Sequence, residues 1–239
     1  MVVNQILTPL FGFYNTLFQP LLAAGPYVSL GFFSAALAAL FAIIYWIFLD
    51  VERADEIKEK LNDYQEKMKQ ARENDKHDKA SEHMKKTLQL NQKFMMLNLK
   101  PMLATVVFVG LFFPWLGNTY APNIQLNETE NSTFSGQLEY AGQSQEVRVL
   151  NVSSGVMVQS GESEVAVRDT LNMLGVSWQV VSFHSIQEEP FDARLKLNAE
   201  FLPLPISLPY VGDALNWLGF YFVLIMPLTY AFRKALGVQ

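Results

Sequence analysis

Three stretches of the chain are apolar for long enough to cross a lipid bilayer. A helix needs about 20 mostly apolar residues to span a hydrocarbon core about 30 Å thick. The candidate stretches are Tyr27–Leu49, Pro101–Leu116 and Ala214–Phe232, of which the second is short by itself and draws on its flanking residues. With their flanking residues, they place membrane helices at residues 27–49, 98–118 and 213–234. The pattern therefore predicts an α-helical membrane protein with a core of three transmembrane helices.

The first 24 residues are apolar on one side only. Asn4, Thr8, Gly12, Asn15 and Gln19 recur at helical spacing and leave a continuous apolar stripe opposite. A one-sided helix of this kind favours the surface of the bilayer. We therefore expect an interfacial amphipathic helix over residues 1–24, with a fourth span as the alternative. A signal peptide is disfavoured because no basic residue precedes the apolar run.

Residues 50–97 carry a different, highly charged pattern that predicts a helical hairpin. Apolar residues recur at spacings of three and four, as in a coiled coil. The pattern breaks at Glu73–Lys79 and then resumes. The two seams are Val51, Ala54, Ile57, Leu61, Tyr64, Met68 and Ala71, and then Ala80, Met84, Leu88, Asn91 and Met95. Two helices folded back on one another explain both halves, whereas a simple solvated spacer has no need of a seam.

The distribution of basic residues predicts the orientation in the membrane. Twelve of the 18 Lys and Arg residues lie between Arg53 and Lys100, and two more are Arg233 and Lys234. Loops rich in Lys and Arg stay in the cytosol. The hairpin and the tail at residues 235–239 are then cytosolic, and the N-terminus lies outside.

Residues 119–212 are expected to form a small β-rich domain outside the cell. Short runs of alternating polarity, such as EVRVLNV and SWQVVSF, are separated by Gly, Ser, Asn and Pro. Without any Cys, this domain folds without disulfides. Three sequons make Asn127, Asn131 and Asn151 candidates for glycosylation.

The sequence contains no recognisable catalytic or cofactor site. It has no Cys and three His, and it lacks the common phosphate-binding, serine-hydrolase and zinc-protease motifs. We therefore expect a protein that is not an enzyme and that binds no metal or cofactor. Interleaved basic and aromatic residues are also absent, so no sequence-specific binding of nucleic acid is expected.

Polar residues within the apolar stretches are few and are therefore informative. We expect these residues to line a groove: Asn98, Lys100, Thr105, Ser34 and Tyr45. Lys100, followed by a proline at the expected start of a helix, either extends its ammonium group to the headgroups or faces a hydrated groove that opens to the cytosol. Four flexible methionines near the cytosolic opening of this groove offer an adaptable apolar surface for varied partners. They are Met84, Met95, Met96 and Met102.

In this order of elements, with a second span that begins NLKPML and a basic tail, the chain resembles the archaeal branch of the YidC/Oxa superfamily of membrane protein insertases. The resemblance implies a cytosol-facing hydrophilic groove that receives nascent transmembrane segments and eases their entry into the bilayer without nucleotide hydrolysis. It also implies the plasma membrane of an archaeon, and a ribosome or targeting factor that meets the hairpin tip at Glu73–Lys79. Bacterial members carry an arginine in the first core helix, but residues 27–49 have no charge.

The resemblance does not extend to residues 119–212, so it implies no function for the outer domain. The alternative interpretation is a receptor or scaffold, in which the outer domain binds a partner and a cytosolic coiled coil carries the signal. A pore subunit is less favoured, because three spans with one lysine provide little polar lining.

Overall fold

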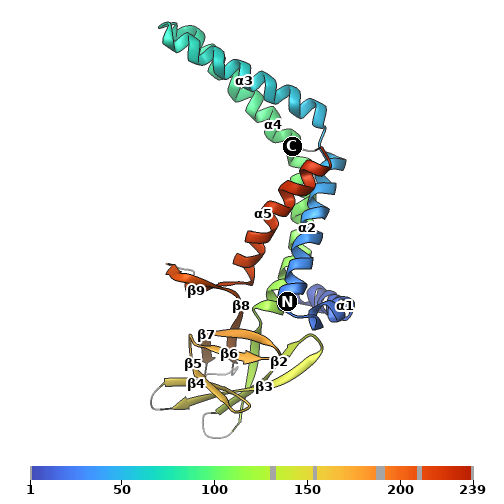
Figure 1. The fold of residues 1–239 in the computed structure, drawn as a ribbon, viewed down its shortest axis with the longest axis vertical. Coiled ribbons are helices and arrows are strands. Elements are labelled where there is room, and N and C mark those ends of the chain that lie inside the picture. Colours follow the sequence, from blue (N-terminus) through green and yellow to red (C-terminus); the bar gives the residue numbers. More distant parts are fainter. Residues whose placement is uncertain (1, 130–132, 153–154, 187–191, 209–211, 238–239) are drawn as a thin grey trace. The chain divides into compact units, whose positions relative to one another are not determined.

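The computed structural model describes residues 2–129, 133–152, 155–186, 192–208 and 212–237. These residues form five helices, which are α1 (Val2–Ala23), α2 (Pro26–Phe48), α3 (Val51–Glu73), α4 (His77–Tyr120) and α5 (Trp217–Ala235) (Figure 1). By internal contacts they divide into two compact units. We call residues 1–36 and 111–227 the sheet unit, and residues 37–110 and 228–239 the hairpin unit.

The sheet unit contains an antiparallel, barrel-like arrangement of strands. The strands follow the order β5-β4-β3-β2-β1-β8-β7-β6, and the end strands β5 and β6 also contact each other. Their bounds are β1 Asn123–Glu128, β2 Thr133–Tyr140, β3 Gln143–Val152, β4 Gly155–Ser160, β5 Ser163–Ala166, β6 Thr170–Met173, β7 Val176–Ile186 and β8 Asp192–Leu208. The sequence is therefore correct in predicting a β-rich domain.

Alternation of polarity explains why these segments form strands around a common core. Successive side chains of a strand point to opposite faces, and the inward ones are fully buried, among them Leu138, Val149, Trp178 and Leu197. β2 and β3 are joined by Ala141 and Gly142, whose φ angles of 54° and 78° suit a two-residue hairpin turn.

β8 extends beyond the barrel as a two-stranded ribbon. It pairs there with β9 (Gly212–Asn216), although the prolines of LPLPISLPYVG are unfavourable for a central strand. A strand that is paired along one edge only tolerates proline. The helix expected at residues 213–234 consequently begins at Trp217, because residues 212–216 form β9.

Aromatic side chains join the barrel to the helices within the sheet unit. The ring of Phe201 on β8 stacks on Phe220 at a centroid distance of 5.3 Å and meets the rings of Tyr27 and Tyr120 at 5.5 Å. The Tyr27 hydroxyl donates a hydrogen bond to the Phe201 carbonyl, and the hydroxyls of Ser29 and Tyr120 lie 2.7 Å apart. The start of α2, the end of α4 and the start of α5 are thus fixed to the domain.

Helix α1 packs against protein on the face that carries Asn15. The Asn15 Oδ1 accepts a hydrogen bond of 2.8 Å from Trp115 Nε1, and Tyr14 and Phe18 contact the Trp115 ring. Phe13 and Leu17 remain more than half exposed. The polar face that the sequence predicts to meet water therefore bonds to α4 at Asn15.

Two of the described helices are long and apolar enough to cross a membrane, α2 and α4. In α5, the apolar run is shorter, and Arg233 and Lys234 occupy its last turn. The core of three transmembrane helices expected from the sequence thus corresponds here to two candidate spans and the shorter α5.

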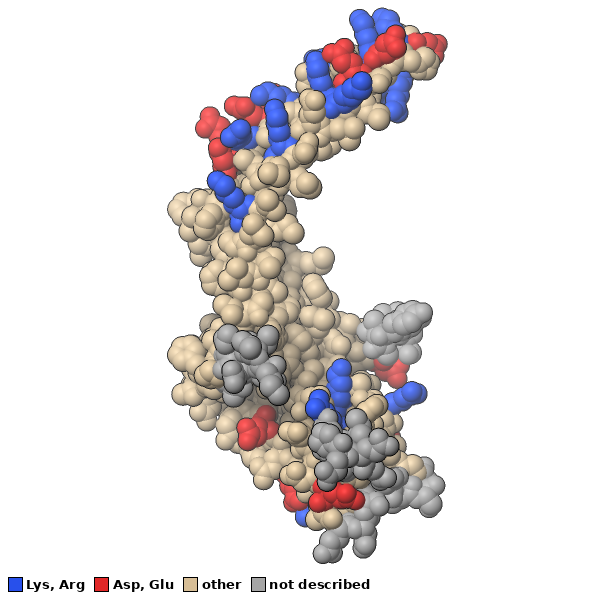
Figure 2. Space-filling view, turned by 180° about the vertical axis from the view of Figure 1, so that it is seen from behind, with Lys and Arg blue, Asp and Glu red and all other residues tan. Residues whose placement is uncertain are grey.

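In the hairpin unit, α3 and the first part of α4 form an antiparallel pair. Asp50 caps α3, since its carboxylate accepts a hydrogen bond from the Arg53 backbone N–H. Tyr64 on α3 meets His83 on α4 at a centroid distance of 5.9 Å. Charged side chains of both signs cover this hairpin (Figure 2). Several form exposed pairs along one helix, as Lys67 does with Asp63.

The packed face of α4 differs from the predicted seam. On α3 the expected residues Ala54, Ile57, Leu61 and Ala71 are buried. On α4 only Ala80 of the seam is buried, whereas Met84, Leu88, Asn91 and Met95 are exposed. The better covered residues are His83, Leu90, Phe94 and Leu97. The predicted seam on α4 is therefore wrong by about a third of a helical turn.

Pro101 lies in the interior of α4, not at the start of a helix as expected. A proline inside a helix lacks the N–H that would bond to the carbonyl four residues earlier, here that of Leu97. One turn before, the Asn98 side chain donates a hydrogen bond of 2.8 Å to the Phe94 carbonyl. The helix continues through the proline, and the Pro101 ring is buried.

Candidate functional site

The hairpin unit contains an open groove of about 590 Å³ where α2 gives way to α3. Phe48 ends α2, and Ile57 and Leu97 supply apolar surface from α3 and α4. The complete lining is Phe48, Asp50, Arg53, Ile57, Gln89, Gln92, Lys93, Met96, Leu97 and Lys100. Polar and apolar groups thus meet at one site, next to the end of an apolar helix.

The groove is lined by three positively charged side chains and only one carboxylate. Arg53, Lys93 and Lys100 are exposed, and among the described residues none of them forms an ion pair. Asp50 is engaged as the cap of α3. Since an unpaired cation near low-dielectric surface attracts anionic groups, the groove favours a ligand that is partly apolar and carries negative charge.

Two of the predicted site residues, Lys100 and Met96, line the groove, and three predicted polar residues bond to their own helices. Asn98 donates to Phe94, Thr105 Oγ1 donates to the Met102 carbonyl at 2.8 Å, and Ser34 Oγ donates to the Leu30 carbonyl at 2.8 Å. Ser34 is fully buried and belongs to the sheet unit, so the expectation that it lines an open groove is corrected.

Tyr45 has a partner that sequence reasoning missed. The guanidinium carbon of Arg233 lies 3.8 Å from the centroid of its ring. Arg233 is half-buried, and its Nε has no hydrogen-bond partner among the described residues. Helix α2 contains no charged residue, and Arg233 of α5 places a positive charge beside it. The signal in the sequence was the position of Arg233 next to the apolar run of α5.

A stripe of exposed apolar side chains runs along α4 on a face other than the one packed on α3. It consists of Met84, Leu88, Met95, Leu99, Met102 and Val106, at spacings of three, four and seven. Met95 and Met102 are 66% and 56% exposed. We call these six residues the methionine stripe. Three of the four methionines predicted to contact a partner belong to it, and Met96 faces the groove.

The stripe crosses from the charged part of α4 into its apolar part. Lys93 and Lys100 are the last two basic residues before the apolar run, and Leu99, Met102 and Val106 lie along that boundary and beyond it. Thioether side chains adapt to differently shaped partners. The face therefore presents exposed apolar side chains on both sides of the boundary between the charged and the apolar part of α4, with Asn91 between Leu88 and Met95.

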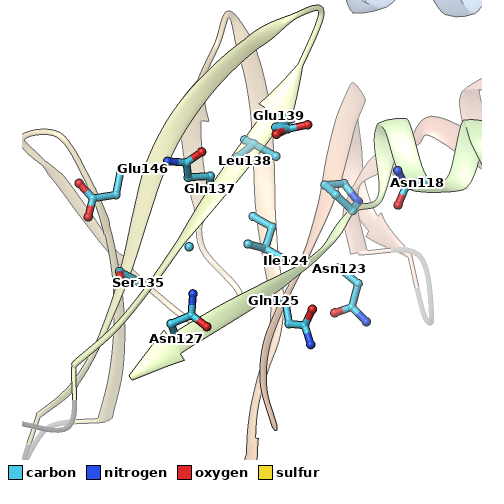
Figure 3. A pocket seen from close by; sticks show the side chains of 12 residues that line it. Asn118, Asn123, Ile124, Gln125, Asn127, Ser135, Gln137, Leu138, Glu139 and Glu146 are labelled. Atoms are coloured by element: carbon cyan, nitrogen blue, oxygen red, sulfur yellow. The ribbon is translucent and has the colours of Figure 1, made fainter. Parts of the chain in front are cut away.

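The sheet unit holds a second cavity of about 550 Å³, a cleft between β1 and β2 (Figure 3). Asn123, Gln125 and Asn127 of β1 face Ser135, Gln137 and Glu139 of β2 across it. Its other lining residues are Asn118, Pro122, Ile124, Gly136, Leu138 and Glu146. The predicted sequon at Asn127 thus lies in a cleft. Asn131 lies outside the described residues, as does the side chain of Asn151.

The described residues contain no group of three or more acidic, His or Cys side chains that could hold a metal ion. His83 has a buried Nδ1 without a partner among these residues, but it lies within the hairpin beside Tyr64. The expectation that the chain is not an enzyme stays a prediction.

Residues 15–133 match a family model described as integral membrane protein EMC3/TMCO1-like. This family belongs to the Oxa1/YidC/Alb3-type superfamily of insertases and is linked to membrane protein insertion. The match covers α2, α3 and α4, which contain the groove and the methionine stripe, and ends at the start of β2. No curated protein and no solved structure matches the chain.

Proposed function

We propose that this chain, whose residues 15–133 match the EMC3/TMCO1-like family, is a membrane protein insertase of the archaeal plasma membrane. It receives nascent transmembrane segments on the cytosolic side and eases their passage into the bilayer without nucleotide hydrolysis. The observation that carries this proposal is the exposed methionine stripe, which extends from the charged part of α4 into its apolar part.

The stripe and the groove have separate roles in this proposal. A transmembrane segment that leaves the ribosome exposes apolar side chains to water, and the stripe covers some of them. The polar residues that flank the segment are costly to bring into hydrocarbon. The groove lowers this cost, because Lys100, Lys93 and Arg53 attract acidic flanks and Gln89 and Gln92 offer hydrogen bonds.

The proposed orientation follows the basic residues. The hairpin and the C-terminus are cytosolic, and the barrel lies outside together with the N-terminus. The hairpin tip at Glu73–Lys79 then meets the ribosome or a targeting factor. Charges of both signs at this tip favour a protein contact over a grip on RNA.

Site-specific photocrosslinking tests the proposal. Photoreactive residues replace Met95 and Met102 on the stripe and Met96 in the groove. Val107 is the control, since it is 61% exposed, lies about a third of a turn round the helix from the stripe and is about three turns beyond Met96. Ribosomes that carry a stalled transmembrane segment are then added to membranes that contain the full chain.

We expect adducts with the nascent chain from Met95, Met102 and Met96, and few from Val107. An insertase reading is untenable if folded protein gives no nascent-chain adduct at any of these positions. Equal adducts from Val107 would show instead that the client meets α4 through lipid without a preferred face. A receptor or scaffold predicts the first of these negative results.

A further inference from the structure

We propose that Asn127 carries an N-linked glycan and that the sugars nearest the protein lie in the cleft between β1 and β2. This proposal rests on the outer location of the sheet unit in the proposed function. It gives a role to the part of the chain that the insertase proposal leaves unexplained.

The sequon is placed so that the first sugars of a glycan on Asn127 can lie in the cleft. Asn127 and Thr129 are two residues apart on β1 and just after it, and both side chains are exposed. No hydrogen bond of the Asn127 side chain is found among the described residues. The Thr129 Oγ1 lies 3.1 Å from Ser135 Oγ, and Ser135 also lines the cleft. A sugar on Asn127 Nδ2 therefore starts at the wall of the cleft.

The cleft lies where β1 and β2 pair only at the sequon and not along the part of β1 that precedes it. They pair at Asn127 with Ser135 and at Glu128 with Phe134, whereas residues 123–126 of β1 pair with β8, and β2 pairs with β3 along its whole length. At Gly136 the two strands still lie close, since a Cβ atom there would be 2.7 Å from the Gln125 carbonyl oxygen, and the open space is lined by residues such as Gln125, Ser135 and Gln137. The space lies next to the nitrogen that would be glycosylated.

The lining suits a sugar better than a charged or wholly apolar ligand. Each sugar hydroxyl donates and accepts hydrogen bonds, and so do the carboxamides of Asn123, Gln125 and Gln137. Glu139 adds an acceptor. Leu138 and Ile124 are buried beneath this lining, so the surface open to a ligand is polar. Figure 3 shows these polar groups around one space.

The attachment is a redox-neutral glycosyl transfer. The donor is a sugar chain esterified to a lipid phosphate or pyrophosphate, and a separate membrane enzyme transfers it to the unfolded chain. The bond from the anomeric carbon to the phosphate oxygen breaks, and that carbon forms a bond to Asn127 Nδ2. The lipid phosphate leaves with the bonding electron pair, and the nitrogen loses one proton to a base.

The first experiment measures glycan occupancy on the full chain purified from the membranes of the cell that makes it. Peptide mass spectrometry should find a glycan on Asn127, lost in Thr129→Ala and kept in Thr129→Ser. Labelling of a cysteine placed in the barrel, with a reagent that does not cross membranes, locates the sheet unit independently. An unmodified Asn127 in a barrel that is labelled from outside overturns this proposal alone. A barrel that is protected overturns the proposed orientation as well.

The second experiment tests whether the sugars lie in the cleft. Thr129→Ala removes both the glycan and the hydroxyl contact to Ser135, so Ser135→Ala is the matched control that removes the contact alone. We expect Tm to fall by about 2–4 °C more in Thr129→Ala than in Ser135→Ala. Gln137→Ala should leave occupancy unchanged and remove part of that difference. Equal Tm values for a glycosylated Ser135→Ala and an unglycosylated Thr129→Ala would mean that the glycan lies in solvent. This result would overturn the proposal that the sugars lie in the cleft.

Discussion

The guanidinium group of Arg233 lies over the ring of Tyr45, with 3.8 Å between its central carbon and the ring centroid. The two residues come from α5 and α2, on the two segments that make up the hairpin unit, and they are far apart in the sequence. A cation over an aromatic face is attracted by the negative charge of the π electrons. This contact therefore ties the ends of the two helices together.

Replacing Tyr45 with Leu should lower the free energy of unfolding by about 1 kcal/mol, because the aromatic face is lost. Tyr45→Phe is the control. It keeps the face and removes only a hydroxyl that has no hydrogen bond among the described residues. Thermal unfolding in mild detergent measures both variants. If Tyr45→Phe is as damaging as Tyr45→Leu, the hydroxyl is responsible and the cation contact is not.

The same substitution, leucine to alanine, at two positions tests which face of the hairpin is packed. Leu61 of α3 is 9% exposed and Leu88 of α4 is 58% exposed. Leu61→Ala should cost about 2–4 kcal/mol, because it opens a cavity. Leu88→Ala should change stability by about 0.5 kcal/mol or less. Comparable losses at both positions would favour the seam expected from the sequence, in which Leu88 contacts α3.

Charge reversal at Lys100 tests the groove. In Lys100→Glu, insertion of a client with an acidic flank should fall about fivefold, as for a loss of about 1 kcal/mol. The matched control is Lys69→Glu on α3, outside both the groove and the hairpin tip, which has the same net charge and no ion pair among the described residues. Protease protection of the client in reconstituted vesicles is the readout. An equal effect of both variants would point to the overall charge of the hairpin, not to the groove.

Tyr140 predicts a dependence of stability on alkaline pH. It is 4% exposed, its hydroxyl lies near those of Ser29 and Tyr120 without a well-aligned hydrogen bond in the described part of the chain, and burial raises its pKa above 10. The unfolded chain then loses this proton at a lower pH than the folded one. The stability that the buried neutral phenol contributes is present below about pH 10 and falls as the pH rises towards the folded pKa.

Tyr140→Phe should therefore reduce the loss of Tm between about pH 8 and pH 11. Near pH 8 it should also keep or raise Tm, because a buried hydroxyl without a well-aligned hydrogen bond is costly. Comparison with Tyr230→Phe, an exposed tyrosine, separates this effect from a general response to alkali. A lower Tm for Tyr140→Phe near pH 8 would mean that the hydroxyl is bonded in solution.

Gly136 marks the point where β1 passes close to β2. A Cβ atom there would lie 2.7 Å from the Gln125 carbonyl oxygen and from Leu126 Cδ2. Gly136→Ala should therefore cost about 1–3 kcal/mol. Gly12→Ala, in α1, meets no atom within 4 Å and should stabilise by about 0.5–1 kcal/mol through helix propensity. If Gly136→Ala is neutral, the two strands do not approach as closely as described, and the cleft is wider.

Local patterns in the sequence were sufficient for much of this architecture. An apolar run of sufficient length predicts a membrane helix, and apolar residues at three-and-four spacing within a charged segment predict the helices of the hairpin. Alternating runs such as SWQVVSF predict strands. These features depend on nearby residues alone, and so the β-rich domain, the break at Glu73–Lys79 and the two long apolar helices were predictable. The expected start of the last helix failed because the partner of residues 212–216, the distant strand β8, is not visible in a local pattern.

What only the tertiary structure decided is which side chains face one another. Met84, Leu88 and Met95 have the spacing of a seam, and so do His83, Leu90 and Leu97, but only the second set is partly covered in the folded hairpin. The contact of Arg233 with Tyr45 and the cleft beside Asn127 likewise join residues that are distant in the chain. Sequence periodicity specifies the angle of a side chain around its own helix or strand. The surface that this side chain meets is specified by another segment, and only folding brings that segment into contact.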